Sequence, residues 1–221
     1  SYENEKVTYQ ELFDYSKKVA NKLARLNVCK GDFVTIELSR NKKYFASMFG
    51  TWMVNAAFAA LDNSYPSDRL DFVAEDCKAK VRITDSFFDD IDNEPLLEKI
   101  IFPKENDYSL LVYTSGSTGR PKGVLHTHLS MHDMTVRGKI GCGFNNLEGK
   151  GYILGLPIPL SFIAGISVSI GAFLDGVSVY IIPYSALRDP QIMSEIIYEN
   201  NISLAYIPPK MIKVFENKNT T

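Results

Sequence analysis

A loop rich in glycine and hydroxyl side chains holds the residues of this chain best suited to chemistry. It reads Thr-Ser-Gly-Ser-Thr-Gly-Arg-Pro-Lys-Gly from Thr114 to Gly123. Glycines let the backbone approach an anion closely and turn its N–H groups inward, and hydroxyls add further donors. Lys122 supplies a point charge suited to a phosphate. We therefore expect a phosphate-binding site made by Thr114, Ser115, Gly116, Ser117, Thr118, Gly119 and Lys122, with Gly123 among the glycines that admit the anion.

The position of Lys122 distinguishes this loop from the phosphate loop of kinases and NTPases. That pattern is G-x-x-x-x-G-K-[ST], whereas here Pro121 precedes the lysine and Gly123 follows it. A flexible linker is the alternative interpretation of so many small residues. A linker, however, needs no fixed Pro-Lys-Gly end. The loop also follows an apolar run, residues 109–113, that is typical of a buried strand, and precedes a helix start at His128.

Alternating helix and strand patterns predict the elements that position this loop. Thr8 is expected to cap the first helix, with Glu11 completing a capping box. Strands are expected at 32–38, 58–62, 80–84, 152–156, 177–182 and 203–207. Helices are expected at 42–56, 67–76 (capped by Ser67), 128–137, 160–174, 189–199 and from Pro208 onward.

This alternation predicts an α/β fold of two side-by-side parallel-sheet units with helices on both faces. We expect the first subdomain at 1–106 and the second, which begins with the phosphate loop, at 107–221. The acidic stretch 87–106 is interpreted as a connector, and the glycine-rich stretch 138–151 as a surface loop.

Composition argues against several other classes of protein. The net charge of −2 gives no electrostatic reason to expect nucleic acid or an anionic membrane as a partner. The three cysteines, Cys29, Cys77 and Cys142, are far apart, which favours reduced thiols in a cytoplasmic protein over a disulfide framework or zinc site. We see no signal-peptide core near the first residue and no run that reads as a membrane span.

The histidines and the possible nucleophiles give weaker signals. His128 and His132 are one turn apart on an expected helix, but no cysteine or second histidine pair supports a metal site there. Capping and surface roles are favoured, and we expect no metal ligand in the chain. Because no nucleophile–base pair is evident, we also expect no catalytic residue, and chemistry by positioning and charge stabilisation instead.

The uninterrupted motif from Tyr113 to Val124 resembles the phosphate loop of the adenylate-forming superfamily. That superfamily includes acyl-CoA synthetases, firefly-type luciferases and the adenylation domains of nonribosomal peptide synthetases. Residues 7–12 and 54–70 resemble two further conserved segments of adenylation domains. The second departs from the family pattern, since Met53-Val54-Asn55 replaces Lys-Ala-Gly and Ala60 replaces a proline. These changes concern packing more than chemistry.

The resemblance implies an AMP-forming ligase that uses ATP and Mg²⁺. The loop would hold the pyrophosphate of ATP while a carboxylate attacks the α-phosphate, and the acyl group would then pass to CoA or to the phosphopantetheine of a carrier protein. The family's other nucleotide-binding segments, its Mg²⁺-holding acid and its C-terminal lid domain would lie beyond Thr221. We therefore expect a fragment that is inactive by itself. A non-catalytic nucleotide-binding or interaction module is the alternative.

Residues 160–176 resemble the segment that carries a substrate-facing aromatic residue in this superfamily, here Phe162, and residues 159–165 resemble the corresponding run of acyl- and aryl-CoA synthetases. Amino-acid-activating domains usually carry an aspartate next, to pair with the α-ammonium, whereas this chain has Ile163. Leaving a buried ammonium unpaired would cost several kcal/mol. The resemblance therefore implies substrate-binding roles for Phe162 and Ile163, and it favours an acyl, aryl, keto or hydroxy acid over an α-amino acid. An acidic residue beyond Thr221 would keep amino acids possible.

Overall fold

The fold was taken from a computed structural model that describes residues 5–115, 120–141 and 151–207. The chain divides into two compact units, Ser1–His132 and Asp133–Thr221, each described below by itself. No helix within the described ranges is both long and apolar enough to cross a membrane.

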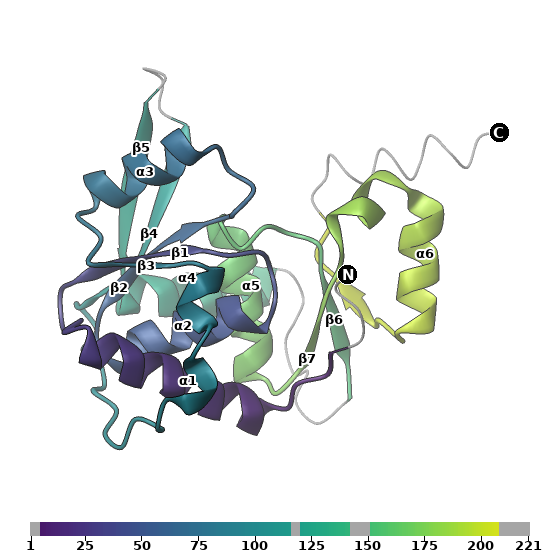
Figure 1. Cartoon of the computed structure of the whole chain (residues 1–221). Helices are drawn as coiled ribbons and strands as arrows, with labels where there is room; N and C mark the ends of the chain where they lie inside the picture. The colour runs from purple at the N-terminus through teal and green to yellow at the C-terminus, as the bar shows by residue number, and fades with distance from the viewer. Residues whose placement is uncertain (1–4, 116–119, 142–150, 208–221) are drawn as a thin grey trace. The chain divides into compact units, whose positions relative to one another are not determined.

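The first unit is built on a five-stranded mixed sheet with the strand order β3-β1-β2-β4-β5 (Figure 1). Four strands are parallel, and β5 pairs antiparallel with β4 at one edge. The strands are β1 (Phe33–Glu37), β2 (Ala57–Leu61), β3 (Val81–Ile83), β4 (Tyr108–Ser115) and β5 (Pro121–Thr127). The central strand β2 is buried along its whole length, as expected for a parallel strand covered on both faces.

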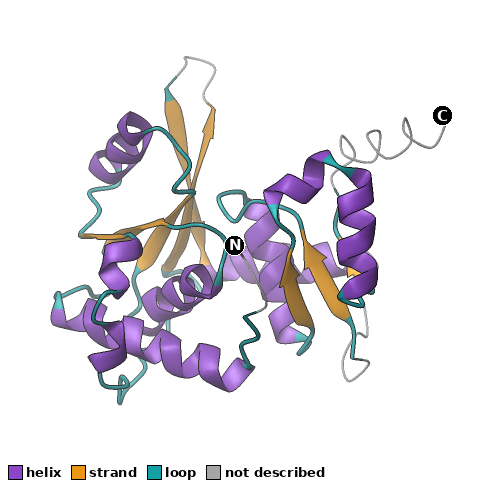
Figure 2. Ribbon diagram, turned by 45° about the vertical axis from the view of Figure 1, so that its right-hand side comes forward, coloured by secondary structure: helices purple, strands orange, loops and turns teal. Residues whose placement is uncertain are grey.

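Helices cover both faces of this sheet. Figures 1 and 2 show α1 (Tyr9–Arg25) and α2 (Lys42–Met53) on one side and α3 (Ser67–Asp76) on the other. Alternate strand residues divide between the two faces. On the α3 side a core cluster forms from Ala59, Leu61, Val73, Leu111 and Tyr113.

The predicted capping box of α1 is confirmed: Thr8 Oγ1 accepts from the Glu11 backbone, and the Glu11 side chain accepts from Thr8. The predicted cap at Ser67 is wrong. The N-cap of α3 is Pro66, and it makes no side-chain cap bond.

The connector between β3 and β4 contains two short 3₁₀ turns, η1 (Asp85–Phe88) and η2 (Ile91–Asn93). Basic side chains of α1 hold it in place. Arg25 pairs with the buried carboxylate of Glu94 at 2.6 Å, and Asn21 donates to the same carboxylate at 2.9 Å. The acidic side chains of the connector therefore face basic side chains of α1.

The second unit contains a three-stranded parallel sheet with the order β7-β6-β8. Its strands are β6 (Ile153–Leu156), β7 (Ser178–Ile181) and β8 (Leu204–Ala205). Its helices are α5 (Ile163–Leu174) and α6 (Pro190–Glu199), with a 3₁₀ turn, η3 (Tyr184–Arg188), before α6. The expected start of α6 is confirmed, because Asp189 caps the Gln191 backbone with Pro190 in the first turn.

Some boundaries differ from the sequence prediction. The helix α4 (His128–Gly141) begins at the expected residue but continues through residues assigned to a loop. The helix α2 ends at Met53 rather than at residue 56, because Asn55 adopts a φ of 56°. The expected subdomain boundary near residue 107 also differs from the contacts, since β4 and β5 belong to the first sheet. The helix expected from Pro208 lies outside the described residues.

Candidate functional site

The predicted phosphate loop joins the two strands of the β4–β5 hairpin. Thr114 lies opposite Lys122, and Ser115 lies opposite Pro121. Both Thr114 and Lys122 are exposed, and the Thr114 hydroxyl donates to the Lys122 carbonyl at 3.5 Å. The structure thus brings Thr114, Ser115 and Lys122 together at the end of the hairpin. Four other predicted site residues, Gly116, Ser117, Thr118 and Gly119, lie outside the described residues.

The strand β5 between the loop and α4 was not predicted, and it gives Gly123 a packing role that the sequence did not show. This glycine lies directly opposite Tyr113. A Cβ at Gly123 would lie 3.1 Å from Leu111 Cδ1 and 3.2 Å from Tyr113 Cζ. The missing side chain of Gly123 therefore makes room for an aromatic ring across the hairpin, and the expected role of Gly123 toward the anion stays a prediction. The sequence signal for this pairing was the aromatic residue just before the loop and the glycine just after it.

Tyr113 anchors the hairpin to α3. Its side chain is 7% exposed, and its hydroxyl donates to Asp76 Oδ2 at 2.6 Å. The ring also meets Phe72 edge-on, with centroids 6.5 Å apart. Burial, together with the hydrogen bond to Asp76, raises the pKa of Tyr113 well above its usual value. The phenol therefore stays protonated and remains a donor at neutral pH.

A polar cluster lies at the other end of the hairpin. Asp107 forms an ion pair with Lys30 at 2.6 Å and accepts from Asn55 Nδ2 at 3.0 Å. The contact with Lys30 lowers the pKa of Asp107. The backbone N–H of His128 donates to the Asp107 carbonyl, and the His128 ring packs edge-on against Trp52. Burial lowers the pKa of His128, partly opposed by the charge of Asp107.

The predicted substrate-binding residues lie at the start of α5. Phe162 is its N-cap and is 56% exposed, and Ile163 is its first residue and half-buried. A tight turn leads into the helix, in which the N–H groups of Phe162 and Gly165 donate to the carbonyls of Pro159 and Phe162. No acidic residue lies in the first turn of α5. These residues belong to the second unit and the hairpin to the first, so each part of the site is described separately.

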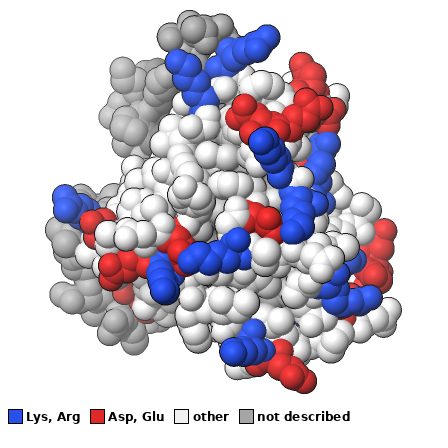
Figure 3. Space-filling view, turned by 90° about the vertical axis from the view of Figure 1, so that its left-hand side faces the viewer, with Lys and Arg blue, Asp and Glu red and all other residues white. Residues whose placement is uncertain are grey.

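Charges of both signs are interspersed on the face of the molecule drawn in Figure 3. Several of these charges are paired within the first unit. Arg82 donates to both carboxylate oxygens of Glu37 at 2.8 Å and to Asp71 at 2.6 Å. Such pairs are structural. The hairpin end contributes two further basic residues, Arg120 and Lys122, which are both exposed.

Comparison with known proteins finds a family model that matches this chain. The family model described as AMP-binding enzyme matches residues 1–102 and 98–221. A dimodular nonribosomal peptide synthase from Bacillus subtilis (strain 168) is 28% identical over 236 residues, which cover 93% of this chain and 9% of that protein.

Solved structures of two proteins share the fold of the chain. The o-succinylbenzoate coenzyme A synthetase (MenE) from Bacillus subtilis in complex with AMP has a TM-score of 0.81 at 23% identity, covering 100% of this chain and 60% of that chain. The same synthetase has been solved in complex with ATP and magnesium ion. Holo-AB3403, a four-domain nonribosomal peptide synthetase bound to AMP and glycine, has a TM-score of 0.81 at 22% identity, covering 96% of this chain and 16% of that one. The chain thus spans less than two thirds of the length of each of these relatives.

Proposed function

Because the chain belongs to the family of AMP-binding enzymes, we propose that it is part of a ligase that activates a carboxylic acid with ATP. In this reaction a carboxylate oxygen attacks the α-phosphorus of ATP, the bond to the β-phosphate oxygen breaks, and acyl-AMP and pyrophosphate form. The observation that carries the proposal is the pairing of Thr114 with Lys122 at the end of the β4–β5 hairpin.

The described residues of the hairpin end suit a phosphate anion. Thr114 offers a hydroxyl and Lys122 a positive charge, and both are exposed. A hydroxyl and an ammonium side by side complement the charge that develops on a departing pyrophosphate. Residues 114–123 contain no carboxylate, so these side chains bind phosphate oxygens, and a Mg²⁺ ion bound with ATP would take its protein ligands from elsewhere in the longer protein.

The start of α5 supports an acid without an α-ammonium group. The first turn of α5 contains no acidic residue, and Ile163 follows the exposed ring of Phe162. Binding there would come from apolar burial, at roughly 25 cal/mol per Å². We therefore favour an acyl, aryl, keto or hydroxy acid as the substrate, with CoA or a carrier-protein phosphopantetheine as the thiol that accepts the acyl group.

The function is tested by ATP–pyrophosphate exchange with the full-length protein over a panel of carboxylic acids. We expect exchange to be strongest with an acid that lacks an α-amino group. A folded protein that supports no exchange with any acid would favour a non-catalytic nucleotide-binding or interaction module instead. The 221-residue chain alone is expected to form no adenylate.

The role of Ile163 is tested in the same assay. We expect Ile163→Asp to give no gain with apolar acids and to improve the use of amino acids, because the carboxylate would pair with their α-ammonium group. Strongest exchange of the wild type with a zwitterionic amino acid would contradict the substrate class proposed here.

A further inference from the structure

The residue just before Thr114 connects the phosphate-binding hairpin to a distant helix. The Tyr113 hydroxyl donates to Asp76 Oδ2 at 2.6 Å, across 37 positions of sequence. The Tyr113 ring is 7% exposed and sits in the core cluster with Val73 of α3. The contact therefore fixes the end of β4 to the C-terminal end of α3.

Asp76 occupies a position that its own helix disfavours. It is the last residue of α3, next to Glu75, and the last turn of this helix contains no basic residue. A carboxylate there faces the negative end of the helix dipole. The hydrogen bond from Tyr113 offsets this unfavourable interaction. The place of Asp76 is therefore better explained by its partner on the hairpin than by the helix itself.

Gly123 lies against the Tyr113 ring from the neighbouring strand. It pairs with Tyr113 across the hairpin, and a Cβ there would lie 3.2 Å from Tyr113 Cζ. The next pair toward the loop is Thr114 with Lys122. A displacement of the Tyr113 ring would therefore act on both strands exactly where the two exposed phosphate-binding side chains begin.

We propose that Asp76 is a positioning residue of the pyrophosphate site, acting through the hydroxyl of Tyr113. The proposal rests on the proposed function, because it assigns the hairpin end to pyrophosphate. Asp76 itself touches no substrate. Its hydrogen bond holds the Tyr113 ring, and with it Thr114 and Lys122, in the arrangement that binds the anion. Sites held by a fixed supporting contact bind more tightly than sites that must be ordered on binding.

The test measures binding of magnesium pyrophosphate by calorimetry in the full-length protein. We expect Asp76→Ala and Tyr113→Phe each to raise the Kd about fivefold, the effect of one lost hydrogen bond. The double variant should be no weaker than Asp76→Ala, because both changes break the same contact. Asp76→Asn keeps an oxygen acceptor and should restore part of the affinity.

Asp71→Ala is the matched control. It removes a carboxylate from the same helix, but one that pairs with Arg82 rather than with the hairpin. We expect its pyrophosphate Kd to equal that of the wild type. In the exchange assay, the KM for pyrophosphate should rise in the Asp76→Ala and Tyr113→Phe variants while the KM for the carboxylic acid stays unchanged, a split that general destabilisation would not produce.

The outcomes separate this inference from the proposed function. Unchanged pyrophosphate affinity in folded Asp76→Ala and Tyr113→Phe proteins would overturn the inference alone. A wild type that binds magnesium pyrophosphate but exchanges none would overturn adenylation, and the Kd comparison would still decide the role of Asp76. A wild type that neither binds nor exchanges pyrophosphate would overturn both.

Discussion

Among the described residues of the hairpin end, only Lys122 combines a positive charge with a position opposite a hydroxyl side chain, that of Thr114. Thr114 is itself predicted to bind phosphate. A lysine suits a phosphate as a point charge, and it acts most strongly where charge develops during reaction. The side chain is exposed and stands beside an exposed Thr114. At the scale of single residues, Lys122 is therefore the most direct probe of the proposed site.

We expect Lys122→Ala to lower the rate of pyrophosphate exchange by about tenfold or more, the effect of removing one electrostatic contact to a reacting phosphate. Lys99→Ala is the matched control, since Lys99 is also exposed but lies in the connector before β4. Equal rates for the two variants in steady-state exchange would show that the role assigned to the hairpin end is wrong.

His128 gives a prediction about pH. Burial lowers its pKa in the folded state below the usual value near 6.5. As the pH falls through about 6.5, the unfolded chain takes up a proton that the folded chain does not, so the folded state loses stability. Burial also lowers the pKa of His126. The full-length protein should therefore melt at a lower temperature at pH 5.5 than at pH 7.5.

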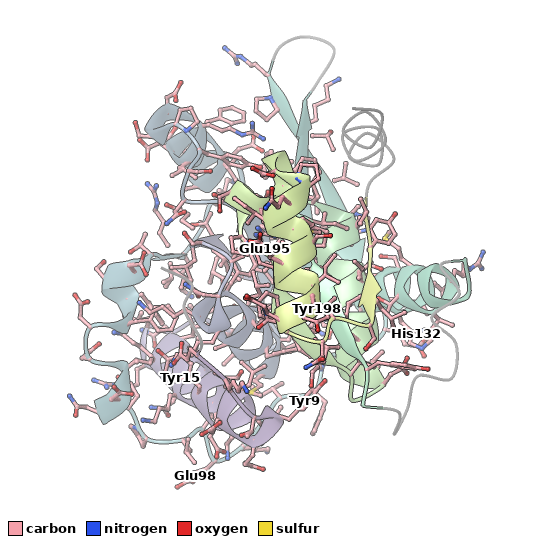
Figure 4. The ribbon with its side chains drawn as sticks, turned by 90° about the vertical axis from the view of Figure 1, so that its right-hand side faces the viewer. Tyr9, Tyr15, Glu98, His132, Glu195 and Tyr198 are labelled. Carbon is pink, nitrogen blue, oxygen red and sulfur yellow. The ribbon has the colours of Figure 1, made fainter. Side chains whose placement is uncertain are left out.

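His128→Gln should reduce this pH dependence, because it removes one group that titrates in that window. The control is His132→Gln, which changes an exposed histidine on the same helix, labelled in Figure 4. If the difference in melting temperature between the two pH values is the same in wild type and His128→Gln, the burial of His128 does not govern it.

The phosphate site stays a prediction from the residue types in the loop, and those residue types did not show the packing role of Gly123. Gly123 stands in the same motif as Gly116 and Gly119, and only the strand opposite it shows that it accommodates Tyr113. Asp76 could not be predicted at all. Its contact with Tyr113 joins residues far apart in sequence, and nothing in a single sequence shows which carboxylate lies near a given hydroxyl.

At the scale of elements, periodicity predicted most helices and strands because their buried faces are strongly apolar. It failed at β5, an edge strand whose central residues are mostly exposed and do not alternate clearly. It also placed the start of α5 too early, at residue 160. Residues 159–162 instead form a turn that is closed by the Phe162 N–H donating to the Pro159 carbonyl, and the Gly165 N–H then donates to the Phe162 carbonyl.

Gly165 makes this turn possible, and its substitution tests the description. A Cβ at Gly165 would lie 2.3 Å from the backbone oxygen of Pro159, which cannot move without opening the turn. At Gly155 the nearest atoms are side-chain methyl groups of Ile182 and Ile202, at 2.8 and 2.9 Å, and side chains shift more readily than backbone. We expect Gly165→Ala to destabilise the protein by about 1–3 kcal/mol and Gly155→Ala by less.

The measurement is thermal unfolding of the two full-length variants by scanning calorimetry. Gly165→Ala should also reduce exchange activity, because Phe162 shares the turn. A Gly165→Ala protein that is at least as stable as Gly155→Ala would mean that the turn before α5 is formed differently.

At the scale of the whole chain, the alternation of helices and strands predicted the α/β class but not how the strands divide. β4 pairs with β2, so it belongs to the first sheet although it begins after residue 107. A boundary inferred from sequence order alone misses such a pairing, because the order of the elements does not show which sheet the strand after the connector joins. Exposed aromatic residues such as Tyr198 on α6, which is 85% exposed (Figure 4), were likewise not separable from core residues by pattern.

The central claim concerns which bond of ATP breaks. Attack of the carboxylate on the α-phosphorus transfers a carboxylate oxygen to AMP once the acyl group passes to the thiol acceptor. Attack on the γ-phosphorus would instead transfer that oxygen to inorganic phosphate and leave ADP. The two routes therefore differ in the product that carries the carboxylate oxygen and in the nucleotide that is released, whichever acid is used.

The most direct measurement is therefore mass spectrometry of the products formed by the full-length protein from ATP, thiol acceptor and the best acid of the panel, labelled with ¹⁸O in its carboxylate. We predict ¹⁸O in AMP, with unlabelled pyrophosphate. Label in inorganic phosphate together with ADP would contradict the account.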